Sequence, residues 1–440
     1  MNNVETSYLA MLMGQSFFIT IGMIILLKPI AFKIGLTDRP CSRKRHNGEV
    51  PLVGGLAIYL CVTYVILTQS VLTPVNMAFL TALTLIAVTG LIDDLKNLNF
   101  KVRFAAETVA ALIMIKWGGV QISSLGNLLG LGDIQLGPFS TFFTVFAVVG
   151  GINAINMIDG IDGLAGCTSL IIYLLLAILC VNYNCADSVQ FCLILAPATV
   201  AFLLFNFPVP GRKKASVFLG DTGSMLFGFT ICWLAISASQ GENKIISPVA
   251  VLWLLATPIL DTLCIMIRRK RRGRSPFAPD REHFHHILPV AGYGIRATLF
   301  IILSFALALA MTGLVGNILF QTPDWLMFYS FIVLFAMYYW GMNHSWKMVK
   351  VARYLREHRD ERRSKKPRRC TNLSNLPFAD RRISTERRSG IDRRYQATSR
   401  DLKIFLNQTS NSGLTVAFKF LNRQTTKQSS YTINSDRRNP

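Results

Sequence analysis

Charged residues are scarce in this chain of 440 residues. Only 16% are Asp, Glu, Lys or Arg and 51% are hydrophobic, whereas about a quarter of the residues of a soluble protein are charged. The composition therefore indicates a protein with several membrane-spanning segments. It also argues against a nucleic-acid partner, because the Lys and Arg behind the net charge of +22 lie between apolar runs and in one C-terminal tail.

Several common motifs are also absent. The nine cysteines are scattered without a CxxC pair, which predicts free thiols and no disulfide framework. The lack of a Walker loop, a GxGxxG turn and a GxSxG elbow removes support for soluble nucleotide-binding and hydrolase folds. The first apolar segment has no basic region before it and no small-residue cleavage site after it, so we expect a retained helix and not a signal peptide.

Long apolar segments dominate the first three quarters of the chain. A helix needs about 20 apolar residues to cross a bilayer, and candidate segments recur at short intervals. We therefore predict an all-α, polytopic transmembrane bundle of about 11 helices. The predicted segments are 8–30, 51–69, 76–92, 104–120, 139–155, 164–181, 189–207, 217–238, 246–267, 297–320 and 325–341.

The positive charges predict how the bundle is oriented. With the N-terminus outside, Lys and Arg gather in the connections that would be cytoplasmic and in the tail, and 156–163 is the one such connection without a cation. We expect a transmembrane domain over 1–343 and a basic cytoplasmic tail over 344–440. The tail repeats DRR or ERR from Asp380, Glu386, Asp392 and Asp436, which is typical of a disordered extension; binding to anionic lipid or an acidic partner is the alternative.

Polar residues recur at every third position within the apolar run 150–166, GGINAINMIDGIDGLAG. If the run were helical, Asn153, Asn156, Asp159 and Asp162 would step around about half of one face, and glycines would loosen the backbone beside the acids. An uncompensated carboxylate at membrane depth costs at least roughly 2.5 kcal/mol, so we expect these groups to line a cavity or bind a cation. A polar seam between helices is the alternative.

Two more acidic sites lie at helix ends predicted to be cytoplasmic. Asp93 and Asp94 are adjacent, so that one could face a metal ion or a nucleophile while a neighbouring cation such as Lys96 or Arg103 holds the other. An interfacial pair without a chemical role is the alternative. Asp221 lies in FLGDTGS, where it could hold Mg²⁺ together with water and substrate phosphates, or instead cap a helix.

Two basic segments on the same predicted face could bind phosphate. DRPCSRKRHNGEVPLVGG, residues 38–55, contains Arg45 and His46 followed by glycines that allow close backbone approach; plain positive-inside topology would also explain it. His283, His285 and His286 form HFHH beside a cluster of cations. Phosphate binding, zinc binding and surface polarity remain open for these histidines.

Acids that suit Mg²⁺ or Mn²⁺, together with Arg and His groups on one face, are the equipment for phosphoryl transfer between two anionic substrates. An ion-coupled transporter would instead be expected to show repeated halves and acids at helix centres. A scaffold that recruits partners through its basic tail would tolerate loss of the acids.

In this order, the five motifs resemble those of the polyprenyl-phosphate N-acetylhexosamine-1-phosphate transferases, glycosyltransferase family 4, over about residues 38–288. The wording RKRHNGEVPLVGG and HFHH is similar to the branch that moves GlcNAc 1-phosphate from UDP-GlcNAc to undecaprenyl phosphate, releases UMP and initiates lipid-linked polysaccharide such as O-antigen. The resemblance implies a bacterial inner-membrane enzyme with a cytoplasmic active site, and it leaves open whether the enzyme is a homodimer.

The resemblance also implies roles for individual residues. Asp93 and Asp94 match the catalytic aspartate pair, and Asp221 matches the ligand of Mg²⁺ or Mn²⁺, with Asp159 and Asp162 shaping the metal and nucleotide-sugar pocket. The substrate-binding residues would be Asn153, Asn156, His283, His285, His286, Arg45 and His46. Many members carry a third acid where this chain has Asn97, so no metal role is implied at that position.

Overall fold

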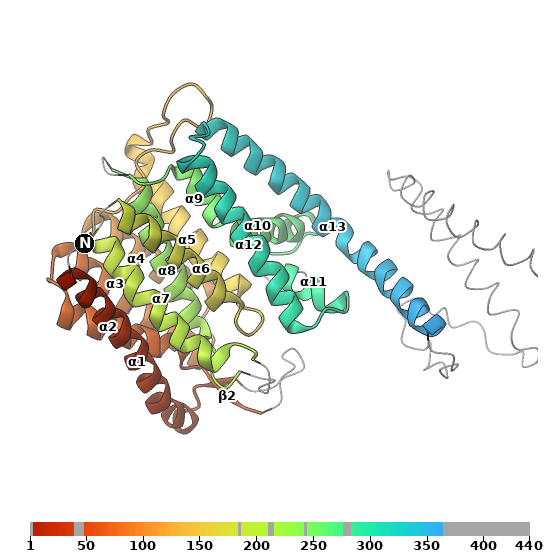
Figure 1. Cartoon of the computed structure of the whole chain (residues 1–440), viewed down its shortest axis with the longest axis horizontal. Helices are drawn as coiled ribbons and strands as arrows, with labels where there is room; N and C mark the ends of the chain where they lie inside the picture. Colours follow the sequence, from red (N-terminus) through yellow and green to blue (C-terminus); the bar gives the residue numbers. More distant parts are fainter. Residues whose placement is uncertain are drawn as a thin grey trace, which may run out of the picture. The chain divides into compact units, whose positions relative to one another are not determined.

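The computed structural model describes residues 3–38, 48–183, 186–209, 215–241, 244–275 and 283–363. Within these ranges the regular secondary structure is helical, apart from the two-residue antiparallel strands β1 (Thr37–Asp38) and β2 (Val50–Pro51), an isolated bridge between Ser124 and Gln135, and a 3-10 turn, η1 (Gly137–Phe139). The predicted all-α class is confirmed (Figure 1). The helices are α1 (Asn3–Ile34), α2 (Gly54–Gln69), α3 (Pro74–Lys96), α4 (Phe100–Lys116), α5 (Ser140–Ile158), α6 (Leu164–Asn182), α7 (Ala186–Asn206), α8 (Gly220–Ser239), α9 (Pro248–Leu254), α10 (Ala256–Arg271), α11 (Phe284–Val290), α12 (Ile295–Ile318) and α13 (Asp324–Arg363).

Each predicted apolar segment is helical, but fewer than eleven qualify as membrane spans. In the described residues, eight helices are long and apolar enough to cross a bilayer, or nine if the bent pair α9 and α10 is one span. The chain is thus a polytopic membrane bundle with a smaller count than predicted. The difference arises because α2 has 16 residues and α4 has 17, which is shorter than the about 20 residues that hydrocarbon thickness requires.

Apolar side chains on the outer helices suit contact with lipid. The most apolar stretches of α1 and α13 are only 22% and 17% buried, and Phe18, Val333 and Met337 are among their exposed side chains. A large exposed apolar surface of this kind is typical of a protein whose solvent is hydrocarbon.

α8 is the central helix, since 94% of its most apolar stretch is buried. Glycines allow its backbone to lie directly against its neighbours: a Cβ on Gly55 of α2 would collide with Gly223, and one on Gly90 of α3 would collide with Thr222. Because apolar surface gains little by leaving lipid, such close approach and van der Waals contact hold membrane helices together. Among the described cysteines, those with free thiols, as predicted, include Cys61, Cys167, Cys192, Cys232 and Cys264.

α9 and α10 meet at a sharp break of 78°. Pro258 lies three residues into α10, where it has no N–H to donate to Leu254, and its ring would clash with that carbonyl in a continuous helix. The break separates α9 from α10, whose last turn carries Arg268, Arg269, Lys270 and Arg271.

The chain divides into two units, residues 1–363 and 364–440. α13 continues through the boundary that we predicted after residue 343 and ends at Arg363. Met342 and Val349 pack with Cys264 and Ile287 in a small apolar cluster. The predicted basic tail beyond Arg363, with its DRR and ERR repeats, lies outside the described residues, as do Arg45 and His46.

The glycine contacts with α8 generate a stability prediction. Gly90→Ala should destabilise the protein by about 1–3 kcal/mol, because the added methyl group meets the backbone of Thr222, which cannot rotate away. Gly150→Ala is the matched control, since a Cβ at Gly150 meets nothing within 4 Å. Thermal unfolding in detergent would measure both variants, and equal melting temperatures would contradict the close packing of α3 on α8.

Candidate functional site

Asp94, near the C-terminal end of α3, binds the N-terminus of α8. Its Oδ1 accepts a hydrogen bond from the backbone N–H of Asp221 at 2.7 Å. Its Oδ2 accepts from the backbone N–H of Thr222 at 3.1 Å and from the Thr222 hydroxyl at 2.8 Å. The first N–H groups of a helix lack partners within it and carry partial positive charge, so a carboxylate is a favourable ligand there. Asp94 therefore fixes the position of the FLGDTGS motif.

The local sequence of the motif makes this approach possible. Gly220 has a φ of +75° and a Cβ there would meet Asp94 Oδ2 at 2.6 Å, so both its conformation and the contact favour glycine. Asp221 lies in the first turn of α8, whose N-cap is Leu219, without a side-chain cap. The alternative that Asp221 caps its own helix is therefore wrong; Asp94, from another helix, supplies the capping carboxylate.

Asp93 points to a different partner. Its Oδ2 pairs with Arg103 of α4 at 2.8 Å, and its Oδ1 accepts from the backbone N–H of Leu98 at 2.6 Å. The neighbouring acids thus have separate partners, as the sequence suggested they could. The same Arg103 nitrogen lies 3.8 Å from Asp221 Oδ1, so this guanidinium connects two of the predicted site residues. Asn97 ends α3 in the left-handed conformation, φ +50°, which is a structural role typical of Asn.

The two predicted asparagines of α5 contact acidic groups. Asn156 Nδ2 donates to Asp221 Oδ1 at 2.6 Å and to Ser224 Oγ at 2.8 Å. Asn153 Nδ2 donates to Oε2 of Glu107 at 2.6 Å, and Glu107 is fully buried in α4. Asn156 is therefore part of the centre around Asp221, while Asn153 holds a buried glutamate.

The run 150–166 is not one helix. α5 ends at Ile158, Asp159 follows as its C-cap, and α6 begins at Leu164 after Gly163 adopts a φ of +85°. The half-face arrangement predicted for four polar residues is therefore wrong, because the helix that carries the two asparagines ends before the two acids. Asp159 is exposed, and Asp162 Oδ2 accepts from the backbone N–H of Ala215 at 3.2 Å.

The histidine motif packs against this turn and against α10. A Cβ on Gly160 would collide with the imidazole of His285, so the ring lies directly on the turn that follows Asp159. His283 and His285 are buried, which excludes plain surface polarity for these two. Their rings are stacked with centroids 5.2 Å apart, and the His286 ring lies 4.2 Å from that of His285.

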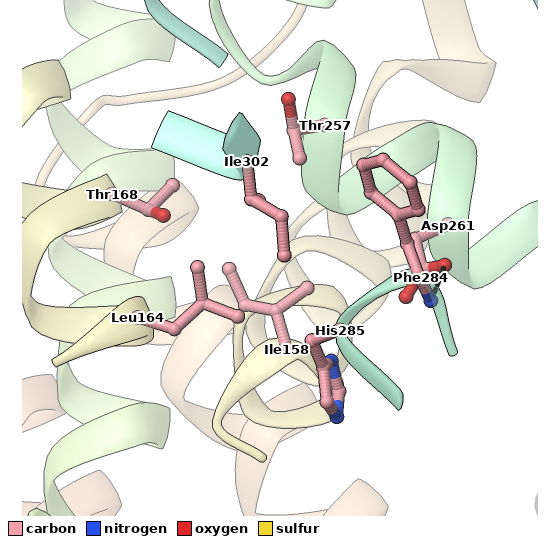
Figure 2. A pocket seen from close by; sticks show the side chains of 8 residues that line it. All are labelled: Ile158, Leu164, Thr168, Thr257, Asp261, Phe284, His285 and Ile302. Carbon is pink, nitrogen blue, oxygen red and sulfur yellow. Dashed lines mark hydrogen bonds between the residues drawn. The ribbon is translucent and has the colours of Figure 1, made fainter. Parts of the chain in front are cut away.

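The buried acid of this region is Asp261 of α10, 3% exposed. Its Oδ2 lies 2.8 Å from His283 Nδ1, and its Oδ1 accepts from the backbone N–H of Phe284 at 3.1 Å and from the Tyr338 hydroxyl at 2.9 Å. Figure 2 shows Asp261, Phe284 and His285 lining one side of a small pocket, opposite Thr168 and Ile302. Asp261 thus connects the histidine motif to α10 and α13.

Burial, together with charge on His286 and His283, lowers the pKa of His285 to about 3, while Asp261 opposes the change. Removal of the ring from water disfavours the imidazolium form. His285 is therefore neutral at physiological pH and can offer a lone pair or one N–H, but not a positive charge.

Two places have donors that suit a metal ion. Asp221 has a side chain that is 38% exposed, and among the described residues its second oxygen accepts no hydrogen bond, so it could join phosphate oxygens on Mg²⁺. The ligand atoms of Asp261, His283 and His285 lie within 4.8 Å of one another. In the described ranges this is the one group of three or more His, Cys, Asp or Glu side chains close enough to hold a metal ion. Asp159 and Asp162 do not join Asp221 in such a cluster.

Sequence reasoning missed Glu107 and Asp261, although a signal was present. Each is a single acid inside a segment that we predicted to span the membrane, 104–120 and 246–267. An acid in such a position is expensive unless it has a partner, so it marks a polar contact between helices. The partners, Asn153 and His283, are far away in sequence, which is why motif spacing did not connect them.

His285 generates a pH prediction. Below about pH 6.5 the unfolded chain protonates this histidine while the folded protein does not until about pH 3. Burial of the neutral ring therefore costs no stability above about pH 6.5, and the free energy of unfolding decreases as the pH falls below that value. At pH 5 the decrease is about 2 kcal/mol. His285→Asn should reduce the drop in melting temperature between pH 7.5 and 5.

His344→Asn is the control for that measurement, because His344 lies on α13 and bonds the carbonyl of Trp340. An unchanged pH dependence in His285→Asn would show that the ring is not held neutral.

Comparisons with known proteins identify a family for this chain. The family model described as Glycosyl transferase family 4 matches residues 76–239. The chain is similar to proteins named undecaprenyl-phosphate alpha-N-acetylglucosaminyl 1-phosphate transferase. That of Pasteurella multocida (strain Pm70) is 39% identical over 337 residues, which covers 76% of this chain and 93% of that protein.

The relatives from Yersinia pestis and Escherichia coli (strain K12) are 35% identical over 355 and 349 residues, covering 79% and 78% of this chain and 96% and 94% of those proteins. Similarity at this level covers more of the chain than the 76–239 range that the family model matches. The chain belongs to glycosyl transferase family 4.

Proposed function

We propose that this protein transfers N-acetylglucosamine 1-phosphate from UDP-GlcNAc to undecaprenyl phosphate, which yields undecaprenyl-pyrophosphoryl-GlcNAc and UMP. An oxygen of the lipid phosphate attacks the phosphorus that carries the sugar; a new P–O bond forms and the bond to UMP breaks. The product is the first intermediate of a lipid-linked cell-envelope polysaccharide. The enzyme works at the cytoplasmic face of a bacterial inner membrane.

One observation carries the proposal: Asp221 is the meeting point of three motifs that are far apart in the sequence. Its backbone N–H binds Asp94, and its carboxylate accepts from Asn156 and lies beside Arg103. Because the side chain is 38% exposed at the end of a buried helix, it can reach a ligand from the aqueous side. Membership of a family of phospho-sugar transferases supports a phosphorylated ligand.

The contacts suggest different tasks for the two acids predicted to be catalytic. Both oxygens of Asp94 accept hydrogen bonds from the N-terminus of α8. We therefore assign Asp94 the task of positioning Asp221, and not that of a general base. A phosphate nucleophile is already anionic near neutral pH, so positioning is the larger requirement. Asp93 holds Arg103, whose guanidinium can bind a phosphate oxygen and offset charge that develops in the transition state.

Asp221 is the residue that would hold Mg²⁺ or Mn²⁺, which supplies positive charge to the pyrophosphate. Asp159, exposed at the end of α5, and Asp162, in the same turn, would line the nucleotide-sugar pocket together with His285, which rests on Gly160. His286 and His283 would donate to phosphate oxygens, as would Arg45 and His46, which lie outside the described residues. Mutation of the Asp221 centre therefore tests the proposal most directly.

Asp221→Asn should reduce UMP release from UDP-GlcNAc and undecaprenyl phosphate, with Mg²⁺ in detergent, by at least about 100-fold, the loss typical of removing one group that stabilises transition-state charge. Asp94→Asn should reduce it similarly, because an amide cannot accept from all three donors on α8. Asp133→Asn, in an exposed loop before α5, is the matched control and should retain activity. Full turnover by both site variants would refute the mechanism.

The identity of the sugar requires a separate experiment. Wild-type protein should release UMP fastest from UDP-GlcNAc in a panel that includes UDP-GalNAc and other UDP-N-acetylhexosamines. A preference for another sugar would keep the reaction and change the substrate. No UMP release from any member of the panel would contradict the proposed activity itself.

A further inference from the structure

The histidine motif contains a second polar centre, built around a residue to which the proposed reaction assigns no role. Asp261 is buried in α10, more than twenty residues before the motif, and it contacts α11 and α13 as well as its own helix. A buried carboxylate is costly unless donors surround it. Two donors and an imidazole nitrogen do: the backbone N–H of Phe284, the hydroxyl of Tyr338 and His283 Nδ1.

This set of donors determines how Asp261 binds His283. The backbone N–H of Phe284 and the Tyr338 hydroxyl both donate to Oδ1, and donation of two hydrogen bonds to the carboxylate favours its ionised form. An ionised carboxylate in turn requires a proton on His283 Nδ1, 2.8 Å away. The ionised Asp261 therefore places a proton on Nδ1 of His283, and Nε2 is the ring nitrogen left for another ligand.

The same contacts restrict the position of the ring. Phe284 is the first residue of α11, and its N–H binds the same carboxylate as the side chain of His283 before it. The peptide and the imidazole at this point are thus held together against α10, and the Tyr338 hydroxyl holds Asp261 from α13. The stacked ring of His285 then limits rotation of His283 on one face.

We propose that Asp261 is the positioning residue of His283: it holds a proton on Nδ1 and fixes the ring orientation, so that in the imidazolium form Nε2–H can donate to a phosphate oxygen of the nucleotide sugar. Tyr338 supports the carboxylate from α13. This inference rests on the proposed function for the identity of the ligand, but the tautomer and orientation do not depend on it. Two histidines of the motif then differ: His283 is oriented by a carboxylate, and His285 is a buried, neutral ring.

The alternative use of these residues is a metal ion, because Asp261, His283 and His285 offer a donor set that suits Zn²⁺. The observed contacts favour positioning: the carboxylate oxygen nearest the ring is already in a hydrogen bond with Nδ1, and an ion held between these two atoms would displace the proton there. The two arrangements make opposite predictions for the protonation of His283 Nδ1.

A double-mutant cycle tests the positioning role. Asp261→Asn should lower kcat for UMP release by about 10- to 100-fold, the usual loss when the partner that orients a histidine is removed, with a smaller change in KM for undecaprenyl phosphate. If Asp261 acts through His283, adding Asp261→Asn to His283→Gln should cause no further loss. Losses that simply add would overturn the proposal.

Tyr338→Phe provides a second route if Asp261→Asn does not fold. It keeps the Asp261–His283 contact and removes one supporting hydrogen bond, so kcat should fall by less than in Asp261→Asn and, again, not fall further in the His283→Gln background. Tyr329→Phe, exposed on the same helix, is the matched control and should be unaffected. Equal activity of Tyr338→Phe and wild type, with additive losses for Asp261→Asn, would leave Asp261 without a role through His283.

A readout independent of activity separates this proposal from the proposed function. With ¹⁵N-labelled histidine, the signal that disappears in His283→Gln should show a protonated Nδ1 in the wild type, and a changed tautomer population in Asp261→Asn. An unprotonated Nδ1, or one equivalent of Zn²⁺ bound to the wild type and lost in Asp261→Asn, would overturn positioning in favour of a metal site. Wild-type UMP release in the same preparation reports on the reaction itself.

Discussion

The contact between the Asp94 carboxylate and the first N–H groups of α8 is the interaction on which the rest of the site depends. The contact pairs two sets of polar groups that would otherwise lack partners. A carboxylate at the end of a membrane helix needs hydrogen-bond donors, and the first N–H groups of a buried helix need acceptors. Gly220 leaves room for the carboxylate, and Gly90 lets α3 lie close enough to Thr222 to bring it there. This contact fixes the backbone of Asp221 against the end of α3.

From that point, the polar groups form two centres connected by the turn between α5 and α6. Asn156, on the last turn of α5, donates to Asp221 in the first centre. Gly160, four residues later, lies against His285 in the second. The run 150–166 is thus a connector between an acidic centre on α3, α4 and α8 and a histidine centre on α10, α11 and α13. An enzyme that binds a nucleotide sugar and a lipid phosphate together needs two such centres in a fixed relation.

Much of the fold could be predicted because hydrophobic length is a strong signal. Every predicted apolar segment is helical. The number of membrane spans was overestimated where the helices are short, in α2 and α4. The segment 246–267 was predicted as continuous, but the chain bends near Pro258. The motif residues could also be found, since acids and histidines are conspicuous in apolar surroundings. Glu107 and Asp261 were missed because a single acid shows no spacing, and its partner comes from a different helix.

The sequence by itself determined the class of the protein: hydrocarbon-length apolar runs require helices, and the ordered acidic, glycine and histidine motifs identify the family. It also placed the candidate residues at the ends of those helices. Only the tertiary structure decided which groups meet, that Asp94 binds α8 while Asp93 binds Arg103, and that His283 is oriented by Asp261. The reason is that hydrogen bonds between helices depend on rotation and distance of approach, and these are set by packing at a few glycines and not by any local pattern.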